Sequence, residues 1–207
     1  MGHIVGAGPG SPDLITVRGQ RLLGEADVVI YAGSLVNPEL LALAGKGAAV
    51  YDSARMTLEE VMDVVEQSHR AGLAVVRLHT GDPCLYGAIR EQMDWMDRKG
   101  IPYDICPGVS SFCGAASALG MEYTLPDVTQ SVVITRMAGR TPVPEKESIE
   151  SFAAHHATMV IFLSTGMLQE LSLRLIAGGY SADTPAAIVY KATWPAEKGC
   201  ICQVSTL

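Results

Sequence analysis

No stretch of the chain is apolar over the ~20 residues that a membrane-spanning helix needs, although hydrophobic residues make up 48% of its 207 residues. The most apolar stretch, residues 158–163, has only the length of a strand. The first expected strand begins at His3, which leaves no room for a secretory signal. We therefore expect a packed protein of the cytoplasm that has no membrane partner.

Basic residues are scarce: 15 Lys and Arg stand against 22 Asp and Glu, which gives a net charge of −7. Nonspecific nucleic-acid binding depends on basic side chains that neutralise phosphates, so this balance argues against a nucleic-acid partner. An anionic small molecule stays compatible with the composition, because it needs only a locally basic cleft.

The five cysteines include no Cys-x-x-Cys pair, and their number is odd. A disulfide framework and a zinc knuckle are therefore both disfavoured, and we expect no metal site held by the protein. Free cysteines are usually small buried residues, which is the role we expect for Cys84, Cys106, Cys113, Cys200 and Cys202.

Two common nucleotide-binding motifs are absent. The loop Gly6-Ala-Gly-Pro-Gly10 contains Gly-x-Gly, but Ser11 stands where a dinucleotide fingerprint needs its third glycine. The second expected strand ends in Ile30-Tyr-Ala-Gly33, without the acid that would hold a ribose hydroxyl. No Gly-Lys-Ser/Thr follows any loop, which excludes a P-loop.

Apolar strand patterns and amphipathic helix patterns alternate along the chain, which predicts an α/β fold with a parallel sheet. We expect strands near residues 3–7, 27–31, 48–51, 73–79 and 102–106. We expect helices near residues 14–24, 38–44, 57–70, 86–98 and 109–119. The helix at 57–70 has the clearest pattern, because Thr57 and Glu60 form a capping box before an apolar stripe.

We place a domain boundary after residue 121, because residues 121–130 carry no helical stripe and include Pro126. An N-terminal α/β domain would span residues 1–121, and a C-terminal α/β domain would span residues 122–207. The second domain would hold strands near 131–136, 158–163, 186–190 and 201–204 and helices near 148–155 and 167–177. Its last strand would be left as an uncovered edge, so we expect this domain to be truncated at its end.

Three Gly/Pro loops of the first domain each follow a strand and precede a helix: residues 6–10, 80–87 and 107–111. In a parallel α/β sheet such loops meet at the carboxyl edge of the strands, where ligands bind. Asp82 in the second loop would either bind a ligand or cap the helix expected at 86–98. Ser110 and Ser111 in the third loop suit a carboxylate or hydroxyl ligand, and simple helix capping is the alternative.

Together, Gly6-Ala-Gly-Pro-Gly10 with Asp13-Leu-Ile-Thr16, Gly81-Asp-Pro83 with Tyr86-Gly87, and Pro107-Gly-Val-Ser-Ser111 resemble the tetrapyrrole methylases. The resemblance covers essentially the whole chain, in the right order and spacing. It implies two α/β domains with the cofactor cleft between them. It also implies S-adenosylmethionine as cofactor, S-adenosylhomocysteine as product and a homodimer as assembly.

Four segments are most similar to family members that methylate ring carbon 11 of precorrin-4 or its cobalt form in corrin biosynthesis. They are Tyr31-Ala-Gly-Ser-Leu-Val-Asn37, Met56-Thr-Leu-Glu-Glu60, His79-Thr-Gly-Asp-Pro83 and Ala88-Ile-Arg-Glu-Gln92. The uroporphyrinogen-III branch of the family carries an aspartate where Ala32 stands, which argues against that branch. The implied substrate is an anionic tetrapyrrole, and the sequence leaves open whether it already carries cobalt.

The resemblance also implies roles for individual residues. The positions that match cofactor contacts of the family are Pro9, Thr80, Gly81, Asp82, Leu85, Ser110, Ser111, Thr165 and Ala192. The match at Thr165 is looser, because Ser164-Thr-Gly166 replaces the Met-Gly of the uroporphyrinogen branch. Basic residues near the expected loop mouths are candidates for the substrate carboxylates: Arg55, Arg90, Arg136 and Lys191. Glu91 matches an acidic residue of related methylases, so we predict that Arg90 and Glu91 act in catalysis.

Other functions stay open at this point. A methylase of the same fold that acts at another ring position is the closest alternative. A non-catalytic module that binds a nucleotide-like ligand is compatible with the three loops alone. A ribosomal-RNA or diphthine methylase of this fold is disfavoured, for RNA by the acidic balance and the lack of a basic run.

Overall fold

The computed structural model describes residues 1–139 and 141–207, which divide into two compact units. Unit 1 contains Met1–Ala115 and Lys191–Glu197, and unit 2 contains Ala116–Tyr190 and Lys198–Leu207. The boundary that the sequence suggests lies a few residues later, and no sequence pattern indicates that 191–197 packs with the N-terminal unit. No helix in the described ranges is long and apolar enough to cross a membrane.

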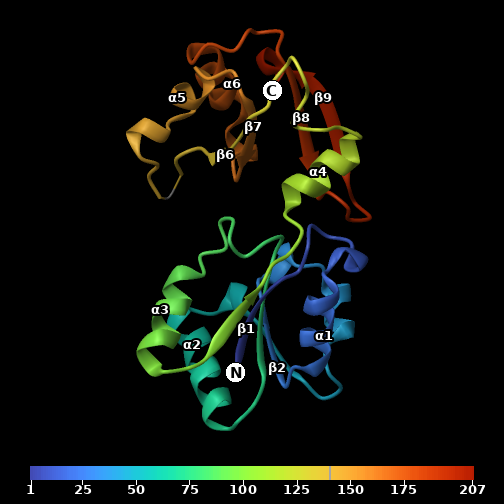
Figure 1. Cartoon of the computed structure of the whole chain (residues 1–207), viewed down its shortest axis with the longest axis vertical. Coiled ribbons are helices and arrows are strands. Elements are labelled where there is room, and N and C mark those ends of the chain that lie inside the picture. The colour runs from blue at the N-terminus through green and yellow to red at the C-terminus, as the bar shows by residue number, and fades with distance from the viewer. Residues whose placement is uncertain (140) are drawn as a thin grey trace. The chain divides into compact units, whose positions relative to one another are not determined.

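A five-stranded sheet in which every pair of neighbours is parallel forms the centre of unit 1 (Figure 1). Its order is β3-β2-β4-β1-β5. The strands are β1 (Gly2–Gly6), β2 (Val28–Tyr31), β3 (Ala49–Asp52), β4 (Val75–His79) and β5 (Tyr103–Cys106). All five lie where the hydrophobic pattern predicts them, and the parallel α/β fold is confirmed. Strand β1 lies between β4 and β5, so the loops that follow these three strands are neighbours.

Helices cover both faces of this sheet: α1 (Val17–Glu25) covers one, and α2 (Leu58–Arg70) and α3 (Arg90–Lys99) cover the other (Figure 1). Alternate strand residues supply the two cores. The core beneath α1 includes Val5, Leu22, Leu23, Val29, Val76 and Leu78. The core beneath α2 and α3 includes Ile4, Ile30, Val61, Met62, Val65 and Met96.

The capping box at the start of α2 is confirmed. The backbone N–H of Glu60 donates to Thr57 Oγ1 at 3.2 Å, and the backbone N–H of Thr57 donates to the Glu60 carboxylate at 2.7 Å. Two of the free N–H groups at this helix end are therefore satisfied by side chains.

Two expected helices differ from the structure. The segment Pro38–Leu43 is a 3-10 helix rather than an α-helix. Helix α3 begins at Arg90, several residues after the expected start near 86. Tyr86 and Ala88 have φ values of 56° and 50°, and these left-handed conformations interrupt a right-handed helix.

Unit 2 contains two separate strand pairs. Strands β6 (Val132–Arg136) and β7 (Thr158–Phe162) pair parallel, and β8 (Pro185–Tyr190) and β9 (Lys198–Gln203) pair antiparallel. Helix α4 (Ser111–Leu119) leads into this unit, and helices α5 (Ile149–Ala153) and α6 (Leu168–Ala177) belong to it. Its core includes Met137, Ile149, Ala153, Leu171, Leu175 and Val204.

The expectation that all five cysteines are small buried residues is wrong. Cys106 is buried at the end of β5, but Cys84, Cys113 and Cys200 are exposed and Cys202 is half-buried. Cys84 lies in a loop, and the side of β9 that carries Cys200 is not covered within the described residues. Local pattern alone therefore did not decide their burial.

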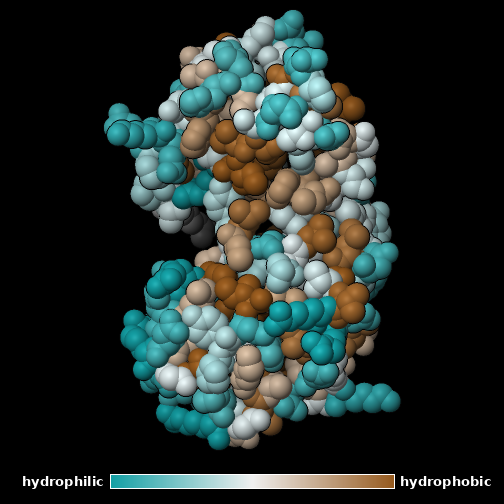
Figure 2. All heavy atoms as spheres, viewed as in Figure 1, coloured by the Kyte–Doolittle hydropathy of each residue, from teal (hydrophilic) through white to brown (hydrophobic). Residues whose placement is uncertain are grey.

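Large apolar side chains also reach the surface of each unit (Figure 2). Val17 and Leu35 are exposed in unit 1, and Val128, Leu163 and Ile201 are exposed in unit 2. Exposed apolar side chains that gather in a patch are typical of contact surfaces.

Candidate functional site

The three Gly/Pro loops follow β1, β4 and β5, which are adjacent strands in the sheet. Because the strands are parallel, all three loops leave the same carboxyl edge. This is the edge at which open α/β sheets bind ligands. The loops that the sequence analysis singled out therefore lie together.

Backbone hydrogen bonds join the first loop to the second. The N–H of Gly8 donates to Gly81 O at 3.2 Å, and the N–H of Gly81 donates to Gly8 O at 2.9 Å. The N–H of Ala7 donates to His79 O at 2.7 Å. The sheet pairing thus extends past the strand ends into the loops themselves.

Two glycines allow the loops to approach this closely. A Cβ atom on Gly6 would lie 2.6 Å from Gly108 Cα and from Gly81 O. A Cβ atom on Gly108 would lie 2.2 Å from Gly81 O. Side chains at Gly6 and Gly108 would therefore push backbone against backbone, and the edge is assembled from main chain. Within it, the peptide groups of Gly8 and Gly81 pair with each other.

The Asp82 carboxylate connects the second loop to the third. One oxygen accepts the backbone N–H of Cys84 at 2.8 Å, and the other accepts the backbone N–H of Gly108 at 3.0 Å. Asp82 does not cap α3, since that helix begins at Arg90 after Ile89, whose side chain makes no capping bond. The carboxylate fixes the local turn and places a negative charge beside the glycine loops.

The start of α4 lies against the second loop. A Cβ atom on Gly81 would be 3.4 Å from the backbone N of Ser111 and 3.6 Å from Ser110 Cα, which is ordinary contact distance. Ser110 is buried, and Ser111 is the first residue of the helix. The second loop thus packs beside the positive end of a helix, where a polar or anionic ligand group is favoured.

The segment Lys191–Glu197 also contacts the first loop, which the sequence analysis did not predict. The indole N–H of Trp194 donates to Pro9 O at 3.1 Å, and the backbone N–H of Ser11 donates to Thr193 Oγ1 at 2.9 Å. Ala192, a predicted cofactor position, is buried within this segment. It packs with unit 1, although the sequence analysis assigns it to the C-terminal domain.

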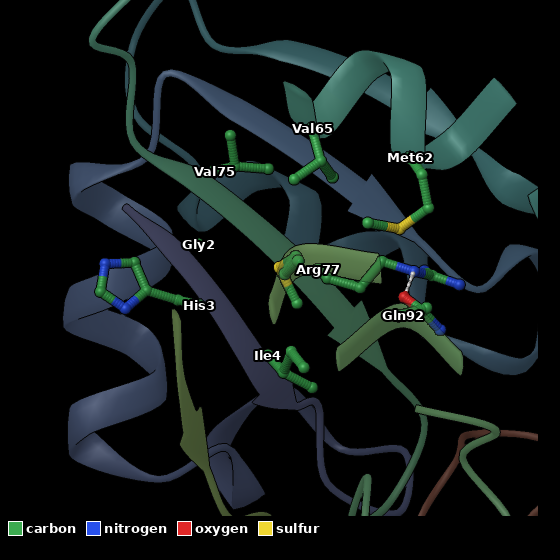
Figure 3. A pocket seen from close by; sticks show the side chains of 9 residues that line it. Gly2, His3, Ile4, Met62, Val65, Val75, Arg77 and Gln92 are labelled. Atoms are coloured by element: carbon green, nitrogen blue, oxygen red, sulfur yellow. Dashed lines mark hydrogen bonds between the residues drawn. The ribbon is translucent and has the colours of Figure 1, made fainter. Parts of the chain in front are cut away.

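Two basic side chains of β4 lie on the α2/α3 face beneath the edge. Arg77 Nε donates to Gln92 Oε1 at 3.2 Å (Figure 3), and Arg77 Nη1 donates to Ile30 O at 3.1 Å. Burial lowers the pKa of Arg77 to about 10, so it remains charged at neutral pH. The hollow beside it has a volume of about 10 Å³, room for one water and no larger ligand.

His79 follows on the same strand face and is only 4% exposed. Its Nε2 atom is buried and has no hydrogen-bond partner among the described residues. Burial, with a contribution from the charge of Arg77, lowers the pKa of His79 to about 3. The imidazole is therefore neutral at physiological pH.

The remaining predicted cofactor positions of unit 1 lie within the loops. Pro9 is buried in the first loop, and Thr80 and Leu85 are half-buried in the second. Thr165 belongs to unit 2, where it is exposed at the start of a 3-10 helix. The structure thus brings together the predicted cofactor positions of unit 1, from four separate segments of the chain.

The predicted basic residues differ in how they are used. Arg55 is 88% exposed, with Asp52 at 4.0 Å. Arg90 is the first residue of α3 and forms an ion pair with Asp94 at 2.7 Å, and Glu91 beside it is exposed.

Arg136 forms hydrogen bonds within unit 2. Its two terminal nitrogens donate to the Thr141 side chain at 2.9 Å and to the carbonyls of Met137, Thr141 and Pro142 at 3.0–3.2 Å. The Lys191 ammonium lies 4.9 Å from the centre of the Trp194 ring in unit 1. Arg136 therefore shapes a loop, and Lys191 accompanies the segment that contacts Pro9.

Sequence reasoning missed three residues around the first loop: Asn37, Thr193 and Trp194. Asn37 Nδ2 donates to Gly10 O at 2.9 Å. The motif Lys191-Ala-Thr-Trp-Pro195 offered a signal, because it holds one of only two tryptophans directly after an expected strand. The described residues contain no cluster of His, Cys, Asp and Glu that would hold a metal ion.

A family profile described as Tetrapyrrole (Corrin/Porphyrin) Methylases matches residues 3–207. A relative from Methanocaldococcus jannaschii, cobalt-precorrin-4 C(11)-methyltransferase, is 53% identical over 195 residues. These residues are 94% of this chain and 75% of the relative.

Two solved structures share the fold. The X-ray structure of cobalt precorrin-4 methyltransferase, a cobalamin biosynthetic enzyme, has a TM-score of 0.96 and 49% identity, over 99% of this chain and 85% of its own. Uroporphyrin-III C-methyltransferase of Thermus thermophilus, solved with S-adenosyl homocysteine, has a TM-score of 0.82 and 28% identity. The match covers 99% of this chain and 83% of that chain. The chain therefore belongs to the tetrapyrrole (corrin/porphyrin) methylases.

Proposed function

We propose that this chain transfers a methyl group from S-adenosylmethionine to ring carbon 11 of precorrin-4 or cobalt-precorrin-4 in cobalamin biosynthesis. The observation that carries the proposal is its 53% identity, over 94% of its length, to an enzyme of that name. The uroporphyrin-III methylase is less similar, at 28% identity. Ala32 stands where the uroporphyrinogen-III branch carries an aspartate, which also supports precorrin-4 as the substrate.

The residues of the sheet edge fit this methyl donor. The Asp82 carboxylate and the start of α4, which packs beside Gly81, place polar groups at this edge. We propose that the donor is held by Pro9, Thr80, Gly81, Asp82, Leu85, Ser110, Ser111, Thr165 and Ala192. The negative charge of Asp82 suits a ligand that carries ammonium and hydroxyl groups.

When bound, S-adenosylmethionine would supply a methyl group activated by its sulfonium. S-adenosylhomocysteine would then leave as a neutral product, and the positive charge passed to the tetrapyrrole would be balanced by loss of a proton. The protein therefore needs no covalent nucleophile. Its contribution is orientation of the two reactants and exclusion of water. Loops locked backbone to backbone suit this task, because their geometry is set before the ligand arrives.

The substrate carries several carboxylates, so cations must meet them despite the net charge of −7. We propose Arg55, Arg136 and Lys191 as binding residues. We propose that Arg90 binds a substrate carboxylate and that Glu91 orients that guanidinium or carries a proton. The position of Arg90 at the start of α3 supports this role, because a positive charge in the first turn of a helix interacts unfavourably with the helix dipole.

Turnover with defined substrates tests the proposal. Incubation with S-adenosylmethionine and cobalt-precorrin-4, precorrin-4 or uroporphyrinogen III is followed by mass spectrometry. We expect one methyl group added to a precorrin-4 form and none to uroporphyrinogen III. Methylation of uroporphyrinogen III alone contradicts the ring position, and no methylation of any tetrapyrrole contradicts the function.

A carboxylate variant tests the donor site by calorimetry. Asp82→Asn removes the charge and the second N–H acceptor, so we expect weaker donor binding by calorimetry. Asp63→Asn, at an exposed position of α2, is the matched control. Equal affinity in both variants removes Asp82 from the donor site.

We also propose that the protein works as a cytoplasmic homodimer. The exposed apolar side chains of both units support an interface between copies. Sedimentation at micromolar concentration tests this, and a monomer alone would contradict it.

A further inference from the structure

The segment Lys191–Glu197 connects β8 to β9 of unit 2, yet it packs with unit 1. Two hydrogen bonds join it to the first glycine loop. Trp194 Nε1 donates to Pro9 O, and Thr193 Oγ1 accepts from Ser11 N. The segment therefore takes one main-chain acceptor and one main-chain donor on either side of Gly10.

The Trp194 indole also fills the space next to Gly10. A Cβ atom on Gly10 would lie 2.1 Å from Trp194 Cδ1 and 2.9 Å from Ala192 O. A side chain at position 10 is thus incompatible with the indole where it lies. The indole of Trp194 therefore occupies the space that a side chain at Gly10 would need.

Other groups hold the same loop from within the N-terminal part of unit 1. Asn37 Nδ2 donates to Gly10 O, and a Cβ atom on Gly114 of α4 would lie 2.9 Å from Pro9 Cβ. The same position on Gly114 is 3.2 Å from Thr193 Cγ2. Residues 9–11 are therefore fixed between the first-unit scaffold and the segment 191–197.

The backbone conformation of this segment is one that its residues rarely adopt. Lys191 and Thr193 have φ values of 49° and 68°, and a positive φ is a clear outlier for a β-branched residue. The Thr193 N–H donates to the Glu197 carboxylate at 2.5 Å, and the Trp194 N–H donates to Lys191 O at 3.0 Å. Strain that the surrounding structure maintains in this way clusters at functional positions.

The pairing of Gly8 with Gly81 and the ring of Pro9 restrain the first part of the glycine loop, and Gly10 depends on support from other segments. Gly8 and Gly10 are the most flexible residue type, and Gly8 has a φ of 79°. A loop that must become ordered when its ligand binds loses affinity by that ordering, and a loop already held does not.

We propose that Trp194, with Thr193, is a positioning residue for the methyl donor. It holds Pro9 to Ser11 in the shape that receives the donor, and it acts on the donor through this loop. The proposal rests on the proposed function, since it assumes that the first loop binds S-adenosylmethionine. Donor affinity, and not tetrapyrrole affinity, then depends on the indole N–H and on the threonine hydroxyl.

Substitutions of matched shape test the proposal. Trp194→Phe keeps an aromatic ring beside Gly10 and removes the N–H donor. Thr193→Val keeps the branched shape and removes the acceptor, and Thr193→Ser restores it. Loss of one neutral hydrogen bond corresponds to a change of about two- to tenfold. We expect the KM for S-adenosylmethionine to rise by this factor in the first two variants, and Thr193→Ser to stay within about twofold of the parent.

Trp95→Phe is the control. Trp95 lies in α3, its Nε1 atom is buried without a partner in the described chain, and its removal leaves Trp194 as the sole tryptophan. In this variant we expect unchanged turnover and a saturable change in Trp194 fluorescence when S-adenosylhomocysteine is added. Absence of that change, while calorimetry detects binding, indicates that the donor binds away from the loop that the indole contacts, and it overturns the positioning role.

The outcomes separate the two levels of the proposal. A parent protein that binds neither S-adenosylmethionine nor its product contradicts the proposed function. Donor binding that is equally tight in the parent, Trp194→Phe and Thr193→Val overturns the positioning role. An equal rise in the KM for donor and tetrapyrrole also overturns it, because it indicates a general structural effect. Where Trp194→Phe fails to fold by circular dichroism, the threonine pair decides.

Discussion

His79 offers a quantitative test of the electrostatics beneath the candidate site. Its ring is 4% exposed, its Nε2 atom has no partner in the described chain, and burial lowers its pKa from 6.5 to about 3. Between these two pKa values the unfolded state binds a proton that the folded state does not. The stability that the neutral His79 ring contributes is therefore fully present above about pH 6.5, and it is lost as the pH falls toward 3.

The size of the loss follows from the two pKa values. Each pKa unit corresponds to about 1.4 kcal/mol, so this histidine alone removes about 2 kcal/mol of stability between pH 7 and pH 5. His79→Leu lacks the proton and should lose about 2 kcal/mol less than the parent over this interval. At pH 7 the variant also removes an unpaired buried nitrogen, so we expect no large destabilisation there.

Urea denaturation at pH 7 and pH 5 measures the effect. His79→Gln is a second variant without a titrating ring, and His155→Gln removes a histidine from an exposed position at the end of α5. We expect His155→Gln to follow the parent and both His79 variants to show the flatter pH dependence. If the parent and the His79 variants lose the same stability between pH 7 and pH 5, the reasoning about this buried ring is refuted.

Two further predictions concern the loops and the substrate residues. Gly108→Ala places a Cβ atom 2.2 Å from Gly81 O and should cost about 1–3 kcal/mol in urea denaturation. Gly139→Ala, with no atom within 4 Å of the added Cβ, should cost less, and equal losses would argue against the packing of the loops. Arg90→Ala breaks only an exposed ion pair with Asp94, worth at most about 1 kcal/mol, so we expect nearly parental stability, a higher KM for the tetrapyrrole and an unchanged Kd for the donor. Glu91→Gln should lower kcat more than substrate affinity, and parental kinetics in both variants would mean that this turn is ordinary surface.

Features that depend on neighbouring residues in the sequence could be predicted. The five strands of the first sheet follow from runs such as residues 28–31 and 75–79, and the start of α2 follows from Thr57 and Glu60. The three loops at one edge follow from strand–loop–helix order and the parallel sheet that this order implies.

Features that depend on contacts between distant segments could not be predicted. The sequence alone does not decide whether Asp82 caps a helix. Only the fold brings the N–H of Gly108 to its second carboxylate oxygen. The late start of α3 depends on left-handed residues at 86 and 88 that no propensity indicates. Trp194 reaches Pro9 across 185 positions of sequence, so its role needed the structure.

The central claim is methyl transfer to one ring carbon of a precorrin-4 form. Turnover of cobalt-precorrin-4 with S-adenosylmethionine labelled with carbon-13 in its methyl group, followed by NMR of the purified product, tests it most directly. We expect a single labelled methyl group with through-bond correlations to ring carbon 11. A label on another ring carbon, or an unlabelled tetrapyrrole beside intact donor, would contradict it.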